Sequence, residues 1–317
     1  MSKSWIIKSI LLAVGFFLLF SLVYRIGFSE VVSTVKKAKL SFALLGVLAY
    51  LVVIFFRSLR WFLLVKTIKD KISYKQFLPF YLANSLMGNL TPFKAGEATT
   101  PFLFKKYLKI PVGQGFSVIV LDRFLELITL TIISVLAIVF VLNRGIENVV
   151  ILSVFRAMFI ALFVVLAILI TVIVSKRTAL KIIGSFGFLR FVEKELDVFY
   201  DTLTLFKKAY RFLIPLILIG WFLEALAPYL VYKSIFPVFF FDVILAQMVT
   251  LGASLVTFIP GGVGIIEVSV FYILNLFGYS PILITGGLLL ARLLLTGTLL
   301  ASGLVGSILI KEEKHTA

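Results

Sequence analysis

The sequence lacks cysteine altogether, has one histidine, and carries 15 acidic residues against 31 basic ones. The absence of cysteine excludes disulfide bonds, thiol catalysis and cysteine-ligated metals. His315 lies in the polar C-terminal tail, where we expect a solvated side chain rather than a metal ligand. The HExxH, GxSxG and GxxxxGKS/T patterns are also missing, which argues against an intramembrane enzyme and against direct use of ATP. We therefore expect a protein that is not an enzyme and needs no cofactor.

A polar stretch long enough for a soluble domain is missing too. Hydrophobic residues make up 61% of the chain, whereas roughly 45–50% is normal for a soluble domain. Apolar runs recur that are long enough to cross a bilayer core of about 30 Å. The composition predicts an all-α polytopic membrane protein, with residues 1–317 in a single integral membrane domain.

The net charge of +16 would suit a nucleic-acid-binding protein, but the basic residues stand in short loops between apolar runs. Lysine and arginine are enriched in this way in the cytoplasmic loops of membrane proteins. We therefore expect no nucleic acid partner. Membrane lipids with anionic headgroups are the expected partners of such loops.

Six apolar runs are predicted to cross the membrane completely. They lie at about residues 5–24, 42–65, 116–142, 149–174, 212–232 and 281–310. No small-residue cleavage motif follows the first run, so we interpret it as a span rather than a removed signal peptide. The polar connection 175–211 is expected to hold an amphipathic helix on the cytoplasmic side, and loop charge places both termini on that side. The basic linker 25–40 disagrees with this orientation.

Two stretches interrupt the apolar runs: NSLMGNLTPFKAGE at residues 84–97 and FIPGGVGIIE at residues 258–267. The apolar pieces around the first break, 77–90 and 98–108, are each too short to cross alone. Irregular backbone at membrane depth needs a cover of protein or water. We therefore expect a re-entrant hairpin here and another at about 243–277. If both hairpins cross fully instead, the chain has eight to ten spans.

The breaks suggest an internal repeat, with one copy at about 42–142 and the other at about 212–310. In each copy a proline at the break is followed by a glutamate and then, 31 or 32 residues after the proline, by an arginine in the next span. These residues are Pro92, Glu97 and Arg123 in the first copy and Pro260, Glu267 and Arg292 in the second. The expected topology turns the copies in opposite directions, so a binding site is predicted near the membrane midplane, where they meet.

Nine charged side chains lie within apolar segments. They are Arg57, Arg60, Lys94, Arg123, Arg292, Glu97, Glu126, Glu224 and Glu267. Each would cost roughly 2.5–3.5 kcal/mol if it faced lipid at a helix centre, so they should face inward and pair. Two interpretations remain: an ion-pair network that holds helices together, or a polar cavity for a charged lipid headgroup. We favour the cavity because two helix breaks accompany the charges and because the planar fork of arginine suits phosphate oxygens.

The candidate binding site combines these charges with residues of the two breaks. Its members are Arg60, Asn89, Pro92, Lys94, Gly96, Glu97, Arg123, Glu126, Glu224, Pro260, Gly262, Gly264, Glu267 and Arg292. The GGVG run would offer backbone amides to an anion at a helix start, although these glycines can equally serve close helix packing. Because Glu97 and Glu267 would repel an anion, we hypothesise that one of them takes up a proton when phosphate binds, which would couple transport to protons.

The blocks NLTPFKAGEATTPFLFKK, LDRFLEL, FIPGGVGIIE and ARLLL resemble the lysylphosphatidylglycerol synthase transmembrane, flippase-like, family. The resemblance covers essentially the whole chain and is most specific at 89–97 and 260–267. It implies a role for Asn89 and for the proline, glycine, glutamate and arginine residues of the two copies, whereas Arg60 and Lys94 are included for their local chemistry.

In multidomain members of that family, such a membrane domain moves aminoacylated phosphatidylglycerol across the bilayer, and a separate soluble domain makes the lipid. This chain ends seven residues after its last span, so we expect a stand-alone member without synthase activity. The resemblance implies translocation of an anionic or phosphate-bearing lipid. The rival hypothesis is a non-transporting membrane subunit that recruits a lipid-modifying or glycosyl-transferring enzyme through the 175–211 surface.

Overall fold

The computed structural model describes Phe17 and residues 20–89, 91–143, 149–185, 196–206, 210–256 and 262–313. The secondary structure in these ranges is helical throughout, as predicted. The helices in chain order are α2 (Phe28–Lys36), α3 (Leu40–Ile68), α4 (Tyr74–Asn89), η1 (Pro92–Thr99), α5 (Thr100–Leu103), η2 (Phe104–Leu108), α6 (Val112–Asn143), α7 (Val149–Val174), α8 (Lys176–Ser185), α10 (Leu196–Leu205), α11 (Tyr210–Lys233), α12 (Phe240–Val256), α13 (Ile265–Leu276), α14 (Pro281–Ala291), η6 (Arg292–Thr296) and α15 (Gly297–Glu313). Of these, η1 is a 3-10 helix, and η2 and η6 are single π-helical turns.

Long apolar helices dominate the molecule. Within the described ranges, three stretches are both long and apolar enough to cross a membrane: Leu40–Ile68, Arg211–Lys233 and Pro281–Ile310. The helices α6 and α7, of 32 and 26 residues, also exceed the length needed for a bilayer core of about 30 Å. Each span predicted from residue 42 onward therefore coincides with a long helix. The span predicted at 5–24 lies largely outside the described residues.

The outer face of α3 shows why this is a membrane protein. Leu44, Leu48 and Phe55 recur at helical spacing and are 58%, 56% and 47% exposed. Arg60 and Leu64, on another face of the same helix, are buried. A soluble protein rarely exposes a continuous apolar stripe of this kind, whereas lipid solvates it. Arg57 and Arg60 of α3 thus face the protein, whereas one stripe of its apolar side chains faces outward.

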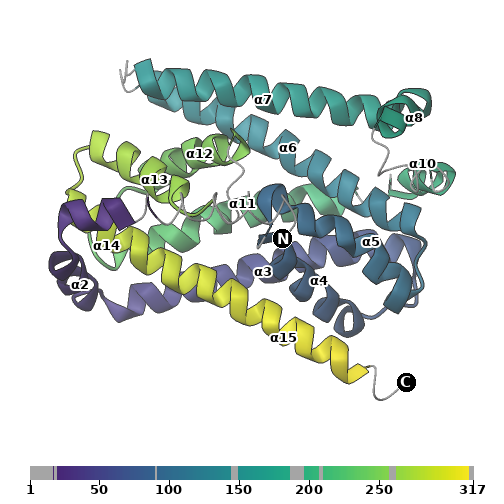
Figure 1. Ribbon diagram of the computed structural model, residues 1–317, viewed down its shortest axis with the longest axis horizontal. Coiled ribbons are helices and arrows are strands. Elements are labelled where there is room, and N and C mark those ends of the chain that lie inside the picture. The colour runs from purple at the N-terminus through teal and green to yellow at the C-terminus, as the bar shows by residue number, and fades with distance from the viewer. Residues whose placement is uncertain are drawn as a thin grey trace.

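The helices α3 and α11 pack side by side in opposite directions. Gly46 near the start of α3 lies against the end of α11, since a Cβ on Gly46 would stand 2.6 Å from the side chain of Val231. Further along α3, Arg57 pairs with Glu224, which precedes Val231 on α11. In Figure 1, α6 runs from right to left beneath α7, whereas α14 and α15 run from left to right.

Both predicted breaks lie between packed helical limbs. In the first hairpin the limb η1–α5–η2 returns antiparallel to α4, with ring centroids 6.2 Å apart for Phe77 and Phe104 and 5.4 Å apart for Phe80 and Tyr107. In the second hairpin α12 packs against α13. The Tyr279 hydroxyl, just beyond α13, donates to Asp242 (2.8 Å) at the start of α12.

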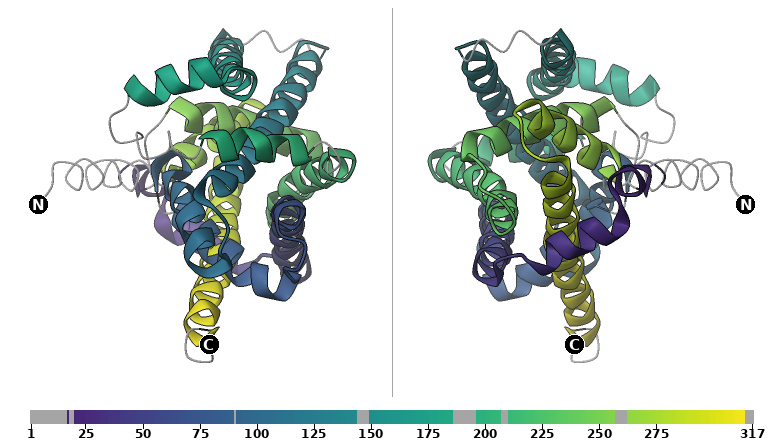
Figure 2. Two further views of the ribbon diagram at one scale, coloured as in Figure 1. Left: turned by 90° about the vertical axis from the view of Figure 1, so that its right-hand side faces the viewer. Right: turned by 90° about the vertical axis from the view of Figure 1, so that its left-hand side faces the viewer.

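The apolar core consists of two clusters that follow the two hairpins. The first contains Trp61, Phe77 and Leu121 from α3, α4 and α6. The second contains Val243 and Ile273 from α12 and α13, together with residues of α11 and α14. The last helix joins the two halves, because the glycines of α15 let it approach α4 closely. Its end extends below the other helices in both views of Figure 2.

The polar connections also contain helices. The linker 25–40, predicted only to be polar and basic, forms α2, which packs against α14. The connection 175–211 contains α8 and α10, in agreement with the predicted surface helix. Phe199 of α10 is buried and Asp197 pairs with Lys176 of α8, so α10 is amphipathic. Both helices lie at the right-hand end of Figure 1.

Candidate functional site

The tip of the first hairpin is shaped by Thr91, Pro92 and Gly96. Thr91 is extended, as expected of a residue before proline, and Pro92 begins the 3-10 helix η1. The hydroxyl of Thr91 donates to the Met87 carbonyl (3.0 Å) and accepts from the Gly96 amide (2.6 Å). A Cβ on Gly96 would lie 2.3 Å from the Met87 carbonyl oxygen, so a larger residue does not fit here. The TPFKAG sequence thus folds the chain back tightly onto the end of α4.

This turn places Glu97 beside α4 at the hairpin tip. Glu97 is buried, and a Cβ on Gly88 of α4 would stand 2.9 Å from its Cγ. One turn further along the limbs, the Thr100 hydroxyl donates to the Asn84 side chain, and both residues are buried. The small residue at 88 and the polar pair behind it therefore hold the Glu97 carboxylate in one place.

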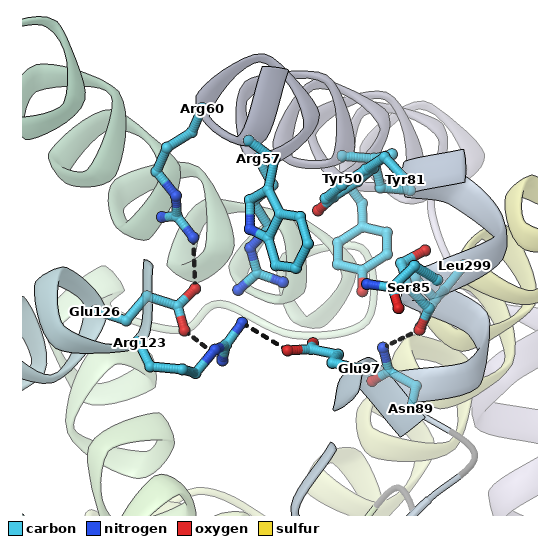
Figure 3. A pocket seen from close by; sticks show the side chains of 13 residues that line it. Tyr50, Arg57, Arg60, Tyr81, Ser85, Asn89, Glu97, Arg123, Glu126 and Leu299 are labelled. Carbon is cyan, nitrogen blue, oxygen red and sulfur yellow. Dashed lines mark hydrogen bonds and ion pairs between the residues drawn. The ribbon is translucent and has the colours of Figure 1, made fainter. Parts of the chain in front are cut away.

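A small cavity of about 30 Å³, partly open to its surroundings, lies beside this carboxylate between α3, α4, η1 and α6. Figure 3 shows charged side chains from both sides converging on it. Its lining consists of Tyr50, Ile54, Arg57, Arg60, Trp61, Tyr81, Asn84, Ser85, Asn89, Glu97, Arg123, Glu126 and Leu299. The cavity therefore lies within an apolar helix bundle but is lined largely by polar and aromatic groups.

Arg60 forms the buried part of the charge network. Its Nε lies 2.6 Å from Oδ1 of Asp122 and its Nη2 lies 2.7 Å from Oε1 of Glu126. The side chains of Arg60 and Asp122 are 5% and 0% exposed. Two carboxylates on successive turns of α6 thus clamp one arginine of α3.

Arg123 joins this network to the hairpin tip. Its guanidinium lies between Glu126 (2.6 Å) and Glu97 (3.1 Å), as Figure 3 shows, with Asp122 at 3.3 Å. Unlike Arg60, its side chain is 29% exposed. The predicted pairing of Arg123 with Glu126 is present. Arg123 is also the more accessible arginine of the two.

Arg57 supplies a third positive charge. It lines the cavity one turn from Arg60 and pairs with Glu224 of α11 at 2.5 Å. Among the side chains that the structure describes, three arginines therefore face four carboxylates, including Asp122, which is a formal surplus of one negative charge. An anion that bound one of these arginines would compete with the carboxylates already paired to it.

Asp122 was missing from the nine charges predicted to face inward. It stands beside Arg123 in the sequence LDRFLEL, four residues before Glu126. That spacing puts both carboxylates on one face of a helix, so the sequence did contain the signal. Tyr50, Trp61 and the other aromatic lining residues could not have been singled out, because aromatic residues are common throughout the chain.

A second charged cluster lies at the second hairpin. Gly264 has φ 83° and caps the start of α13, and its amide donates to Oε2 of Glu267 at 2.7 Å. Oε1 of Glu267 in turn lies 3.0 Å from Nε of Arg292 in η6. Gly262 also has a positive φ, of 60°, and a Cβ there would stand 2.6 Å from the Ile266 side chain. The helix start that the GGVG run would offer to an anion is thus filled by the chain's own carboxylate.

The two clusters have the same construction. Glu97 and Glu267 each stand on the returning side of a hairpin, just after the break, and each pairs with an arginine of the following long helix. Arg57 of the first half and Glu224 of the second half form an ion pair at 2.5 Å. The charged groups of the two halves therefore approach each other across the middle of the molecule.

Comparison with known protein families shows to which family the chain belongs. The family described as the lysylphosphatidylglycerol synthase TM region matches residues 5–303. The chain belongs to this family. A UPF0104 membrane protein of Methanothermobacter thermautotrophicus is 23% identical over 306 residues, which cover 90% of each chain. A UPF0104 membrane protein of Pyrococcus horikoshii is 24% identical over 288 residues, which cover 82% of this chain and 84% of that protein.

Within this member of the lysylphosphatidylglycerol synthase TM region family, the predicted site residues form two groups. Arg60, Asn89, Glu97, Arg123 and Glu126 line the first cavity, and Glu224 reaches it through Arg57. The second group comprises Gly262, Gly264, Glu267 and Arg292. Gly96 shapes the first turn without lining the cavity. Pro92 starts η1, the side chain of Lys94 lies outside the described structure, and Pro260 lies outside it entirely.

Proposed function

We propose that this protein translocates a phosphate-bearing anionic lipid, with the headgroup passing through the cavity beside the first hairpin. The observation that carries this proposal is the position of Arg123. It lies in an apolar helix, pairs with a carboxylate at a hairpin tip, and keeps 29% of its side chain exposed. An arginine needed only for helix packing gains nothing from such exposure, whereas a phosphate ligand requires access.

The surplus carboxylate suggests how the headgroup is accommodated. A phosphate that bound Arg123 would compete with Glu97, the carboxylate that reaches Arg123 from the hairpin rather than from its own helix. Once released, Glu97 would be a buried charge without a partner, which is costly. We propose that it then takes up a proton, so that headgroup movement is coupled to protons. Transport that does not respond to a pH gradient would contradict the proposed coupling to protons.

We further propose that the two halves form an inverted repeat with six full spans and two re-entrant hairpins. The opposite directions of α3 and α11 support this arrangement, because each is the first helix of its half. The matching Glu97–Arg123 and Glu267–Arg292 pairs support it as well. In such folds the substrate site lies where the repeats meet and each repeat opens toward one side. Both termini would then be cytoplasmic in the cell membrane.

Reconstitution into liposomes tests the proposed function. Headgroup-labelled phospholipids and isoprenoid phosphates are incorporated with the purified protein, and their accessibility from outside is followed over time. The variants Arg123→Ala and Glu97→Gln are measured beside the matched control Arg177→Ala, which removes an exposed arginine on α8. We expect selective movement of one lipid class that both cavity variants lose by at least tenfold and the control retains.

Absence of movement for every lipid, with all proteins folded, would contradict the proposal. The buried charges would then serve structure alone. Copurification of a lipid-modifying or glycosyl-transferring enzyme through the α8–α10 surface would in that case favour the recruiting-subunit hypothesis.

A further inference from the structure

A second hollow lies at the base of the first hairpin, at the end of α4 far from the tip. We call it the basal pocket. It has a volume of about 440 Å³, is partly open to the surroundings, and is lined by Lys69, Lys71, Ile72, Gln76, Phe80, Tyr107 and Leu108. None of these residues lines the cavity at the tip. The basal pocket is therefore a separate feature of the same hairpin.

Its floor is apolar and its rim is basic. Phe80, Ile72 and Leu108 are buried and form the apolar part. At the rim, Nζ of Lys69 donates to the Leu108 carbonyl at 2.7 Å, which holds the ammonium group against the end of η2. Lys71 is exposed beside it. The carbonyl stands just before Lys109, whose left-handed backbone (φ 55°) ends the π-helical turn η2.

The surroundings add further positive charge. Lysines cluster on both segments that meet here: Lys66, Lys69, Lys71 and Lys75 on one side and Lys105, Lys106 and Lys109 on the other. Asp70 is the one carboxylate among these two runs. Within the part of the chain that the structure describes, no ion pair neutralises any of these lysines. Nζ of Lys106 lies 5.3 Å from the ring centre of Tyr107, which lines the pocket.

We propose that the basal pocket binds a phosphate group, and that its apolar floor selects the phosphate of an anionic membrane phospholipid. The lysines would hold the phosphate, and the glycerol and upper acyl segments would lie on Phe80 and Tyr107. Each lysine near an anionic membrane surface adds about 1 kcal/mol of attraction, or roughly fivefold in affinity. This site is independent of lipid translocation through the cavity at the tip, and it would anchor the hairpin base at the headgroup level.

Lipid binding to the purified protein in detergent tests this proposal. Native mass spectrometry measures the affinity for phosphatidylglycerol and for phosphatidylcholine. We expect phosphatidylglycerol to bind more tightly, Lys71→Gln to weaken it about fivefold, and Lys69→Gln/Lys71→Gln to weaken it further. The matched control Lys36→Gln removes an exposed lysine from α2 and should change the affinity less than twofold. Arg123→Ala should retain tight binding, because its cavity shares no residue with the basal pocket.

Competition by soluble glycerol phosphate identifies the source of the phosphate. If it displaces the lipid at equal concentration, the phosphate alone is recognised. If it does not, the lipid itself is the ligand. Equal affinity for the two phospholipids, or equal effects of Lys71→Gln and Lys36→Gln, would overturn the proposal. If no lipid is translocated in any liposome assay but phosphatidylglycerol still binds the basal pocket, the proposed function is contradicted. The proposed basal site is then still supported.

Discussion

At the scale of single residues, Arg60 and Arg123 share one network but meet different surroundings. The Arg60 side chain is 5% exposed and faces Asp122 and Glu126, whereas that of Arg123 is 29% exposed and reaches the hairpin tip. A buried charge that loses its partner cannot be solvated, while an accessible one can. We therefore propose that Arg60 mainly holds α3 against α6 and that Arg123 contacts the ligand.

Replacing Arg60 by methionine should destabilise the protein by about 3–5 kcal/mol, because Asp122 and Glu126 lose their shared partner in a buried site. Thermal unfolding in detergent would show this as a lower midpoint. The double variant Arg60→Met/Asp122→Asn should recover part of the loss, since it removes the orphaned charge as well. An unchanged midpoint for Arg60→Met would contradict the structural role given to this pair.

At the scale of elements, the hairpin tip depends on one close approach. Gly96→Ala would place a methyl group 2.3 Å from the Met87 carbonyl oxygen, so we expect a loss of about 1–3 kcal/mol from overpacking. Gly220→Ala in α11 is the matched control, because a Cβ at Gly220 meets nothing within 4 Å. Alanine is favoured over glycine inside a helix, so this variant should keep or raise the unfolding midpoint. Equal effects of the two substitutions would count against the tight turn.

At the scale of the whole molecule, the proposed inverted repeat predicts on which side each hairpin base lies. The chain has no cysteine, so a membrane-impermeant maleimide labels only the cysteine that is introduced. The labelling then shows on which side of the membrane that residue lies. Ser73→Cys and Lys109→Cys stand at the two ends of the first hairpin and should react from the same side. Ser280→Cys, just before α14, should react from the opposite side. Labelling of Ser73→Cys and Ser280→Cys from one side would rule out opposite orientations of the halves.

The sequence alone predicted the long apolar helices and the break at Pro92. Apolar run length sets a span, because every backbone group in lipid must bond within its own helix. Proline lacks a backbone N–H and glycine is conformationally free, so both disfavour a helix where they stand. The break at Pro92 and the turn at Gly96 could therefore be predicted from the local sequence. The Arg123–Glu126 pair was predictable for the same reason, since its spacing belongs to one helix.

Only the tertiary structure decided which distant charges pair. Arg57 meets Glu224 on another helix, and Glu97 and Glu267 meet Arg123 and Arg292 across their hairpins. Nothing in the spacing of these residues selects one partner over another, because the choice follows from how whole helices pack. The surplus carboxylate and the basal pocket likewise emerge only where segments far apart in the chain come together.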